Sequence, residues 1–577
     1  MTLQQISLAM IVRNEDTRLA QCLESVKDAV DEIVIVDTGS SDTTVDIAQK
    51  YTTKIYSYQW NDDFAAARNY AIEQTTGDWV LSLDADEQLS IDSGALNLLV
   101  NQSEYTAFCL PLCALKTCNE YREYDRFMVL RLFRRNYRFT NPVHEYVSID
   151  DPTTVGYTCH PVIWHTAVST SERRTRRGRN IRLLKTAIAL NNTDPYLHYY
   201  LGTEWLGVSC TDLAIAAFQV ALRQFATAQT VFRTPAVRHL ISCYKQSVKL
   251  DEAIRLCLEE SEHYPEYCDL FFDGAVLFEL QGEYALAIKW FQEAIRLGPP
   301  PLTFFHTDGT DSYLAYYHLG YCSEKLSLIK EAEKYYEQAL ATSQNYYYPL
   351  YPLVLLKLTQ QPALEVLRFL REQDYLEVSE VAGKMAELFW TAGFPDIGVQ
   401  CLEPKVAPDA RELEILVTCQ LYSGEIAGAL QSILQMRQQG IEPSTTVAVD
   451  EIVALMLLDR YEEARLQMWS LWQKPDNRDV FRAVFCLYKK LCHNASIPLA
   501  NPQATATLLA LSNRCLQVRT KDFSKQRRFA AVIAAIKGLL ANDAESLALV
   551  IHELSVKEQG VRQSLDYTFS TLRGLYQ

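Results

Sequence analysis

Short apolar runs alternate with helical stripes along the first part of the chain. Residues 6–12, 32–37, 54–57 and 79–83 form the apolar runs, and the segments between them carry apolar residues at helical spacing. Apolar runs of this length, bounded by turn residues, are typical of buried strands. Strands that alternate with helices in short units predict an α/β fold with a mostly parallel sheet and right-handed crossovers.

Three of these predicted strands end in polar residues. Asn14 and Glu15 follow the first strand, Asp37 ends the second, and Asp84 and Asp86 follow the fourth. A buried strand cannot carry charges through its interior, so these side chains must emerge at its end. The carboxyl edge of an open α/β sheet is where such folds hold ligands. We therefore expect these residues to lie close together in a binding site.

The Asp84-x-Asp86 spacing suits a divalent cation. Two carboxylates one residue apart can bring hard oxygen ligands to one Mg²⁺ or Mn²⁺ once the chain turns. The pattern alone is weak, because Asp-x-Asp occurs by chance and an acidic turn is often only solvated. The sequence has neither a dinucleotide-binding glycine motif after the first strand nor a P-loop motif. Phosphate charge would then be met by the cation and by Arg68.

The first four segments together resemble the successive motifs of the family 2 glycosyltransferases. The resemblance runs from Ile6 to Glu87 and is closest to the bacterial branch whose transferase domain is joined to tetratricopeptide repeats. The matching stretches are SLAMIVRNE, EIVIVDTGSSDTTVDIA, NDDFAAARN and GDWVLSLDADE. The resemblance implies a GT-A fold, Rossmann-like with a mostly parallel sheet, and a nucleotide-sugar donor, foremost a UDP-sugar.

The resemblance also implies roles for individual residues. Asp37 would contact the nucleoside, and Asn14 and Glu15 would border the base and ribose. Asp84 and Asp86 match the metal motif of the family, with Asp84 also close to the nucleotide sugar. Arg68 would assist on the phosphate side of the donor.

Beyond the acidic turn the pattern predicts one helix and three further strands. The helix is expected over residues 89–100, and the strands over residues 105–115, 127–133 and 161–165. These strands are positioned to extend the sheet.

The stretch FTNPVHE, residues 139–145, resembles the R-L-F-R … V-H-E signature of the same branch. An inverting sugar transfer requires a base that deprotonates the acceptor as it attacks the anomeric carbon. Glu145 is the candidate for that base. The alternative is that Glu145 is a surface carboxylate on a loop and that His144 is a structural hydrogen-bonding residue.

His165 ends the last predicted strand. An imidazole can complete a Mn²⁺ shell beside two carboxylates, so His165 is a third candidate metal ligand. In the family this histidine is usually followed by Gly-Tyr, whereas Thr166-Ala167 follow it here. His160 is the weaker alternative ligand.

Residues 173–182 contain six arginines in an otherwise acidic chain. One interpretation is a solvated helix face at a domain junction. The other is that one or two of these arginines reach back to the donor diphosphate as a closing element, where Arg would stabilise the charge of the leaving group. The sequence leaves both open.

From residue 183 onward helical stripes replace the strand pattern. Small and aromatic residues recur at tetratricopeptide spacing in four irregular repeats, with an insert near residues 299–311. The positions in the frame include Gly202, Ala214, Phe218, Ala221, Leu240, Tyr244, Ala253, Ala275, Phe278, Ala287, Phe291, Leu319, Gly320, Ala332 and Tyr336. These are packing positions. A solenoid offers a concave surface for a peptide or protein, or for a homodimer.

We therefore expect four segments. Residues 1–170 form the GT-A domain, 171–190 a basic linker helix, 191–350 the tetratricopeptide repeats and 351–577 a helical extension.

Composition narrows the class of protein. The chain has 577 residues, of which 48% are hydrophobic and 22% charged, which is typical of a soluble globular protein with several domains. Its net charge of −16 argues against general nucleic-acid binding. We find no secretory signal and no apolar run that would span a bilayer. The fifteen cysteines include no C-x-x-C pair, and we expect a cytoplasmic location.

The sequence thus predicts a metal-dependent, inverting glycosyltransferase. It would move a sugar from a nucleotide sugar to a glycan, lipid or peptide acceptor, held in part by the repeats. One alternative is an interaction scaffold with a degenerate transferase domain, although every carboxylate that the chemistry needs is present. Nucleotidyl transfer is a second alternative, but that chemistry usually requires a basic, glycine-rich loop after the first strand.

Overall fold

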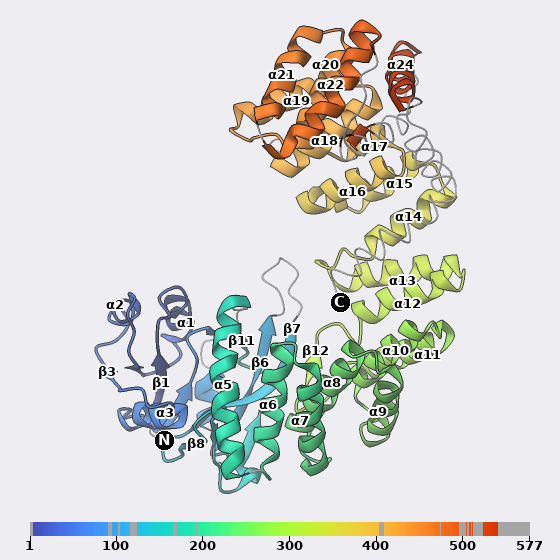
Figure 1. The fold of residues 1–577 in the computed structure, drawn as a ribbon. Helices are drawn as coiled ribbons and strands as arrows, with labels where there is room; N and C mark the ends of the chain where they lie inside the picture. The colour runs from blue at the N-terminus through green and yellow to red at the C-terminus, as the bar shows by residue number, and fades with distance from the viewer. Residues whose placement is uncertain are drawn as a thin grey trace. The chain divides into compact units, whose positions relative to one another are not determined.

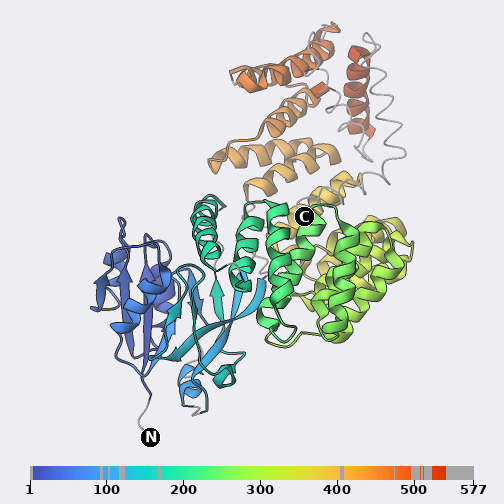
Figure 2. The same cartoon turned by 60° about the horizontal axis from the view of Figure 1, so that its bottom comes forward.

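The computed structural model describes most of the chain. The described residues are 4–90, 95–101, 104–115, 124–165, 170–191, 193–402, 409–473, 475–495 and 523–540, with 504, 507–508 and 511. They fall into two compact units, Met1–Pro349 and Leu350–Gln577. The first unit contains a mixed sheet followed by helical hairpins, and the second is helical (Figures 1 and 2). This is the GT-A-like sheet and helical solenoid that the sequence predicts.

The amino-terminal half of the sheet has the predicted parallel strands. Strand β1 lies between β2 and β4 and is parallel to both, and β3 is parallel to β2 on the outer side. The elements are β1 (Ile6–Val12), α1 (Leu19–Val26), β2 (Glu32–Asp37), α2 (Thr44–Ala48), β3 (Ile55–Ser57), α3 (Phe64–Glu73) and β4 (Trp79–Ser82). The carboxyl ends of these strands therefore meet at one edge.

The remaining strands are added to the β4 side of the sheet. The complete order is β3-β2-β1-β4-β7-β6-β11-β5, and β10 also pairs with β6. The elements are β5 (Glu87–Leu89), α4 (Ala95–Val100), β6 (Ala107–Leu115), β7 (Tyr124–Arg134), β8 (Phe139–Thr140), β9 (Tyr146–Val147), β10 (Val155–Tyr157) and β11 (Ile163–His165). Strand β7 is antiparallel to both β4 and β6, so the sheet is mixed.

One local prediction is wrong. The sequence predicted a helix from residue 89, but Glu87–Leu89 form strand β5, which pairs with β11. The helix α4 begins at Ala95, and residues 91–94 lie outside the described part of the chain. The pairing places His165 opposite Glu87. It therefore brings the last predicted strand beside the acidic turn.

The two faces of the central strands are buried under different helices. Ile6, Leu8 and Met10 of β1 pack in a cluster that contains Leu19 and Leu23 of α1. On the opposite face, Ala9 packs in a cluster with residues of α3. Burial on both faces explains why these strands are apolar along their length. Polar groups are left to the strand ends.

Four helical hairpins follow the basic helix α5. They are the pairs α6/α7, α8/α9, α10/α11 and α12/α13, as the four predicted repeats require. The elements are α5 (Thr170–Leu190), α6 (Pro195–Gly207), α7 (Thr211–Gln224), α8 (Thr230–Gln246), α9 (Leu250–His263), α10 (Cys268–Gln281), α11 (Tyr284–Leu297), β12 (His306–Thr307), α12 (Tyr313–Lys325) and α13 (Ile329–Thr342).

Small residues let the two helices of a hairpin approach closely. A Cβ added to Gly202 would lie 2.7 Å from the ring of Phe218, and one added to Gly320 would lie 2.5 Å from the ring of Tyr336. Both distances are shorter than a carbon–carbon contact, which is about 3.5 Å at its optimum. The small and aromatic positions are packing positions, as the sequence indicated.

The insert between α11 and α12 runs along helix α8. Thr230 donates to Thr303 and Arg238 donates to Thr307, while the backbone N–H of Phe305 donates to Thr234 Oγ1. Four residues of helix rise about 6 Å and two residues of extended chain about 6.6 Å, so the two spacings match. The chain therefore fills this stretch of the repeat surface with its own extended segment, residues 303–307.

The same segment ends in strand β12, which joins the transferase sheet. His306 and Thr307 pair antiparallel with Arg126 and Asp125 of β7. The sequence predicted an insert here but no strand. The repeats and the sheet thus share one hydrogen-bonded network.

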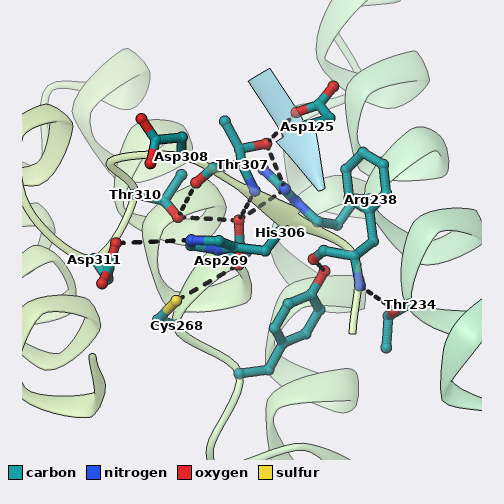
Figure 3. Close-up of polar contacts among 12 residues, drawn as sticks. Asp125, Thr234, Arg238, Cys268, Asp269, His306, Thr307, Asp308, Thr310 and Asp311 are labelled. Atoms are coloured by element: carbon teal, nitrogen blue, oxygen red, sulfur yellow. Dashed lines mark hydrogen bonds and ion pairs between the residues drawn. The ribbon is translucent and has the colours of Figure 1, made fainter. Parts of the chain in front are cut away.

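A buried carboxylate, Asp269 of α10, organises that junction (Figure 3). It accepts hydrogen bonds from Arg238 Nη1 at 2.8 Å, the Thr307 backbone at 2.9 Å and Thr310 Oγ1 at 3.0 Å. Its other oxygen lies 2.8 Å from His306 Nδ1. We call these five residues the docking network. They attach β12 to the repeats.

The second unit is an all-helical extension with its own apolar core. Its helices are α14 (Leu350–Gln360), α15 (Ala363–Glu372), α16 (Ser379–Thr391), α17 (Pro395–Leu402), α18 (Ala410–Ser423), α19 (Ile426–Gln438), α20 (Thr445–Leu457), α21 (Tyr461–Gln473), α22 (Arg478–His493) and α24 (Phe523–Leu540). Among the helices described in either unit, none is long and apolar enough to cross a membrane.

Candidate active site

The ends of β1 and β2 are joined by side-chain hydrogen bonds. Asn14 has a φ of 54°, and its Oδ1 accepts from the Ser41 backbone at 2.8 Å. Asp37 accepts from the Ser40 backbone at 3.1 Å. Glu15 donates its backbone N–H to Thr44 Oγ1 at 2.7 Å. The three residues predicted to contact the nucleoside therefore lie on one ordered edge.

An open cavity of about 510 Å³ lies beside Asp37. It is lined by Asp37, Val45, Gln49, Thr52, Thr53, Ile55, Tyr56 and Ser57. Its volume falls within the range of small-molecule sites, which is roughly 300–1,000 Å³.

Asp84 lies between two arginines. Arg68 Nη2 donates to Asp84 Oδ1 at 2.5 Å, and Arg131 Nη2 donates to Asp84 Oδ2 at 2.9 Å. Arg131 Nη2 also donates to Glu87 Oε1 at 2.5 Å. Burial would raise the pKa of Asp84, but the two guanidinium groups outweigh it and hold that pKa well below the usual range. Asp84 is therefore a fixed anion.

Arg68 connects Asp84 to the candidate base. Its Nη1 donates to Ser82 Oγ at 3.2 Å, and its Nε donates to Glu145 Oε1 at 2.5 Å. The side chain of Glu145 is only 12% exposed, so Glu145 is not a freely solvated surface carboxylate. One buried guanidinium thus holds both the acidic turn and the base candidate.

Asp86 faces a different set of partners. His165 Nε2 lies 3.7 Å from Asp86 Oδ2, and Arg176 Nη1 lies 3.5 Å from the same oxygen. Burial would lower the pKa of His165, but Asp86 and the nearby carboxylates outweigh it and raise that pKa above its ordinary value. A carboxylate oxygen and an imidazole nitrogen that meet at one point fit the donor preferences of Mn²⁺.

The arginines of the basic segment have different partners. Arg176 Nη2 reaches Glu15 Oε1 at 3.0 Å, in addition to Asp86. Arg177 pairs with Glu204, Arg179 lies over the ring of Phe64, and Arg182 pairs with the exposed Asp62. Neither interpretation of the segment holds for every member: Arg176 reaches the acidic edge, while Arg182 lies at the surface. The side chains of Arg173 and Arg174 lie outside the described part.

Comparison with known proteins identifies the family. Residues 7–151 match the sequence model described as Glycosyl transferase family 2. A TPR repeat-containing protein of Synechococcus elongatus is 32% identical over 316 residues, which cover 51% of this chain and 76% of the relative. The chain belongs to glycosyl transferase family 2. The domain match and the relatives named glycosyltransferase make it a glycosyltransferase enzyme.

Other proteins are similar to parts of this glycosyltransferase. The SPbeta prophage-derived glycosyltransferase SunS of Bacillus subtilis is 26% identical over 302 residues, 50% of this chain and 71% of the relative. A glycosyltransferase of Rickettsia conorii is 40% identical over 87 residues, 15% of this chain and 30% of its own. The crystal structure of MamA covers 30% of this chain and 94% of its own, with 20% identity and a TM-score of 0.25.

Sequence reasoning about the glycosyltransferase missed two residues at this edge. Arg131 bridges Asp84 and Glu87, and Glu204 of α6 lies 3.2 Å from His144 Nε2. Arg131 could have been noticed as the one charged residue within the apolar stretch FMVLRLF. Glu204 had no such signal, because it lies in a repeat helix. His160 is exposed, and Thr166 and Ala167 lie outside the described residues.

One further cluster has side chains that can bind metals. Among the described residues, Cys268, Asp269 and His306 place their ligand atoms within 4.8 Å of one another. Both Asp269 oxygens already have protein partners in the docking network. Burial raises the pKa of the Cys268 thiol above its ordinary value, which disfavours the thiolate form that binds metals. We assign the cluster to the attachment of β12.

Proposed function

We propose that this glycosyltransferase uses a UDP-sugar as donor, requires Mn²⁺ or Mg²⁺, and inverts the anomeric centre. The observation that carries the proposal is that two sets of side chains lie at this edge. Asp86 lies close to His165 in one set, and Glu145 is bound by Arg68 in the other. One set has the donor atoms for a cation, and the other offers a base. The inverting, metal-assisted sugar transfer that we propose uses both.

Asp86 and His165 would hold the cation. A bound divalent cation neutralises the charge of the departing diphosphate. Arg176 contacts the same Asp86 oxygen from helix α5 and can offer its guanidinium to that diphosphate.

Asp84 would orient the donor from its fixed position between Arg68 and Arg131. The sequence suggested that Arg68 meets phosphate directly. Its Nε, Nη1 and Nη2 atoms all donate to Glu145, Ser82 and Asp84, so we propose a positioning role instead. Arg68 keeps Asp84 and Glu145 at a set separation.

The nucleoside would lie at the ends of β1 and β2. Asp37 lines the open cavity, and Asn14 and Glu15 lie on the adjoining edge. A base and ribose need this kind of half-enclosed surface with a few polar groups.

Glu145 would act as the base. Its carboxylate removes the proton of the acceptor while the acceptor atom forms its bond to the anomeric carbon. The bond between that carbon and the diphosphate oxygen breaks, and its electron pair leaves with the diphosphate.

The acceptor class is a glycan, a lipid or a peptide. A solenoid surface suits an extended polymer, which favours a peptide or protein. Residues 303–307 already lie along helix α8, so such an acceptor would bind elsewhere on the repeats.

Calorimetric titration of UDP tests the donor site. We expect binding in Mn²⁺ that is lost in EDTA and falls at least roughly tenfold in Asp86→Asn, since one charge-assisted ligand is removed. Asp62→Asn is the matched control, because Asp62 pairs with Arg182 of the same basic segment but is exposed.

Three results would count against the proposal. Equal UDP binding in Mn²⁺ and in EDTA would remove the metal requirement. Binding of GDP or CDP in preference to UDP would change the donor class. Absence of binding by all three nucleotides would favour the interaction scaffold.

A further inference from the structure

The loop that carries Glu145 has an unusual backbone. It comprises residues 141–145, between β8 and β9, and two of its non-glycine residues have positive φ: 71° at Asn141 and 49° at His144. Such residues occupy a sparsely populated region, and they persist only where the surrounding structure holds them. The contacts that hold this loop therefore matter for the position of Glu145.

The transferase domain holds the loop at both ends. The Phe64 backbone donates to Pro142 O at 2.9 Å, and Arg68 donates to Glu145. Both donors belong to helix α3.

The helices after the sheet hold the middle of the loop. Val143 is buried in a cluster with Leu184 of α5 and Leu197 of α6. The ring of His144 stacks on Tyr200 of α6, with centroids 4.0 Å apart and planes 6° from parallel. His144 Nε2 lies 3.2 Å from Glu204 Oε1, one helical turn further along α6.

Glu204 is itself firmly held. It is 4% exposed and accepts from Asn180 Nδ2 at 2.8 Å and from Arg177 Nη1 at 3.0 Å. Burial would raise its pKa, but the hydrogen bonds from His144 and Asn180 outweigh that effect and lower the pKa. A Cβ on Gly207 would lie 2.0 Å from Arg177 Cζ, so a glycine there makes room for this arginine.

We propose that Glu204 is a positioning residue for sugar transfer, and that the first repeat helix is part of the active site. Glu204 fixes the His144 ring against Tyr200. The residue that follows His144 in the chain is Glu145, the base candidate. The proposal rests on the proposed role of Glu145. It gives the first repeat a catalytic task that is separate from acceptor binding.

The expected size of the effect follows from the geometry. Glu145 follows His144 directly, so a rotation of the His144 backbone would move the carboxylate relative to Arg68. A displacement of about 1 Å at a reacting group can cost roughly 10²-fold in rate. The UDP site at β1 and β2 does not involve this loop and should be unchanged.

Glu204→Gln tests the proposal, with Glu260→Gln as a matched control. Glu260 of α9 is also a buried carboxylate in a repeat helix, 5% exposed and paired with Arg233. Its partner Arg233 lies within the repeats, so the control reproduces the loss of a buried charge without touching the base loop. Glu145→Gln is run beside both.

Three quantities are measured on the full chain in Mn²⁺. The first is the turnover of UDP-glucose and of UDP-N-acetylglucosamine, measured as released UDP. The second is the affinity for UDP, measured by calorimetry. The third is the amide hydrogen exchange of residues 139–147. For Glu204→Gln we expect kcat to fall roughly 10- to 100-fold, unchanged KM and UDP affinity, and faster exchange in that segment. For Glu260→Gln we expect wild-type values of all three.

The outcomes separate this inference from the proposed function. If Glu145→Gln loses turnover while Glu204→Gln keeps it, the positioning role is overturned and the base stands. If Glu145→Gln turns over like wild type, the base assignment is overturned. If wild type turns over neither sugar nucleotide, the donor proposal fails. Unchanged hydrogen exchange of residues 139–147 in Glu204→Gln would also overturn the positioning role.

Discussion

Two clusters of carboxylates and arginines lie in the first unit, and they differ in how completely the protein satisfies them. In the docking network, Asp269 is fully buried and both its oxygens are bonded to protein partners. At the acidic edge, the carboxylates outnumber the guanidinium groups that pair with them. The Asp84 side chain there remains 37% exposed. The carboxylates are Glu15, Asp84, Asp86, Glu87 and Glu145, and the arginines are Arg68, Arg131 and Arg176.

The difference explains why one cluster is a candidate site and the other is not. A buried carboxylate whose partners are all protein groups contributes to the attachment of elements, and removing a partner is costly. A cluster that keeps negative charge in excess, with access from solvent, attracts a cation. The residue types are nearly the same in both places, so the balance of charge and access decides the role.

The largest expected effect comes from the base candidate. Glu145→Gln should lower kcat roughly 10²- to 10⁴-fold, because an amide cannot take the acceptor proton. UDP affinity in Mn²⁺ should stay within about twofold of wild type, since the base does not hold the donor. Turnover by UDP release and calorimetry check this, and an equal loss of UDP affinity would instead assign Glu145 to donor binding.

Asp269→Ala should affect stability and leave the metal site unchanged. Removing this carboxylate leaves His306 without its closest carboxylate and leaves Asp273 as the remaining ion-pair partner of Arg238, which should cost about 3 kcal/mol. Urea unfolding measures the loss. Mn²⁺ titration in the presence of UDP should match wild type. Loss of a tightly bound metal from the variant would show that Cys268, Asp269 and His306 form a metal site.

Arg176→Ala should have opposite effects on the binding of Mn²⁺ alone and on the binding of UDP with Mn²⁺. Arg176 contacts the Asp86 oxygen that the proposed cation would also use, so the variant should bind Mn²⁺ alone more tightly. It should bind UDP with Mn²⁺ about tenfold more weakly, because a charge-assisted contact to phosphate is lost. Arg182→Ala, which alters only a surface pair, should change neither. Weaker binding of Mn²⁺ alone would overturn the competition.

Glu32→Gln should have the smallest effect and tests a carboxylate at the opposite end of β2. Burial would raise the pKa of Glu32, but hydrogen bonds from Lys54, Ser7 and Thr76 lower it to about 2. The unfolded value is about 4.3, so the carboxylate stabilises the fold above that pH and the benefit is lost as the pH falls towards 2. Thermal unfolding should show the variant less stable at pH 7, with a difference that shrinks below pH 4.3. A constant difference would contradict this.

The sequence was most informative about features that depend on residues close together in the chain. Alternating strands and helices predicted the parallel half of the sheet, and the polar residues that follow β1, β2 and β4 do share its edge. The tetratricopeptide frame predicted close packing at Gly202 and Gly320. These features depend on residues that are near one another in the chain.

Contacts between distant residues could not be read in this way. The strand β12 begins about 170 residues after the end of β7, and it has only two residues and no apolar pattern of its own. The different partners of Asp84 and Asp86 depend on Arg131, Arg176 and His165, which lie on three separate elements.

The sequence by itself determined the family, the alternating strands and helices of the first part of the chain, the repeats and the polar residues that follow β1, β2 and β4, because periodicity and strand ends are local properties. Only the tertiary structure decided that Asp84 is held by arginines while Asp86 faces His165, and that Glu204 of a repeat holds the loop of Glu145. The physical reason is that charge pairing acts across space. A carboxylate takes its role from the cations that folding brings near it, whatever their distance along the chain.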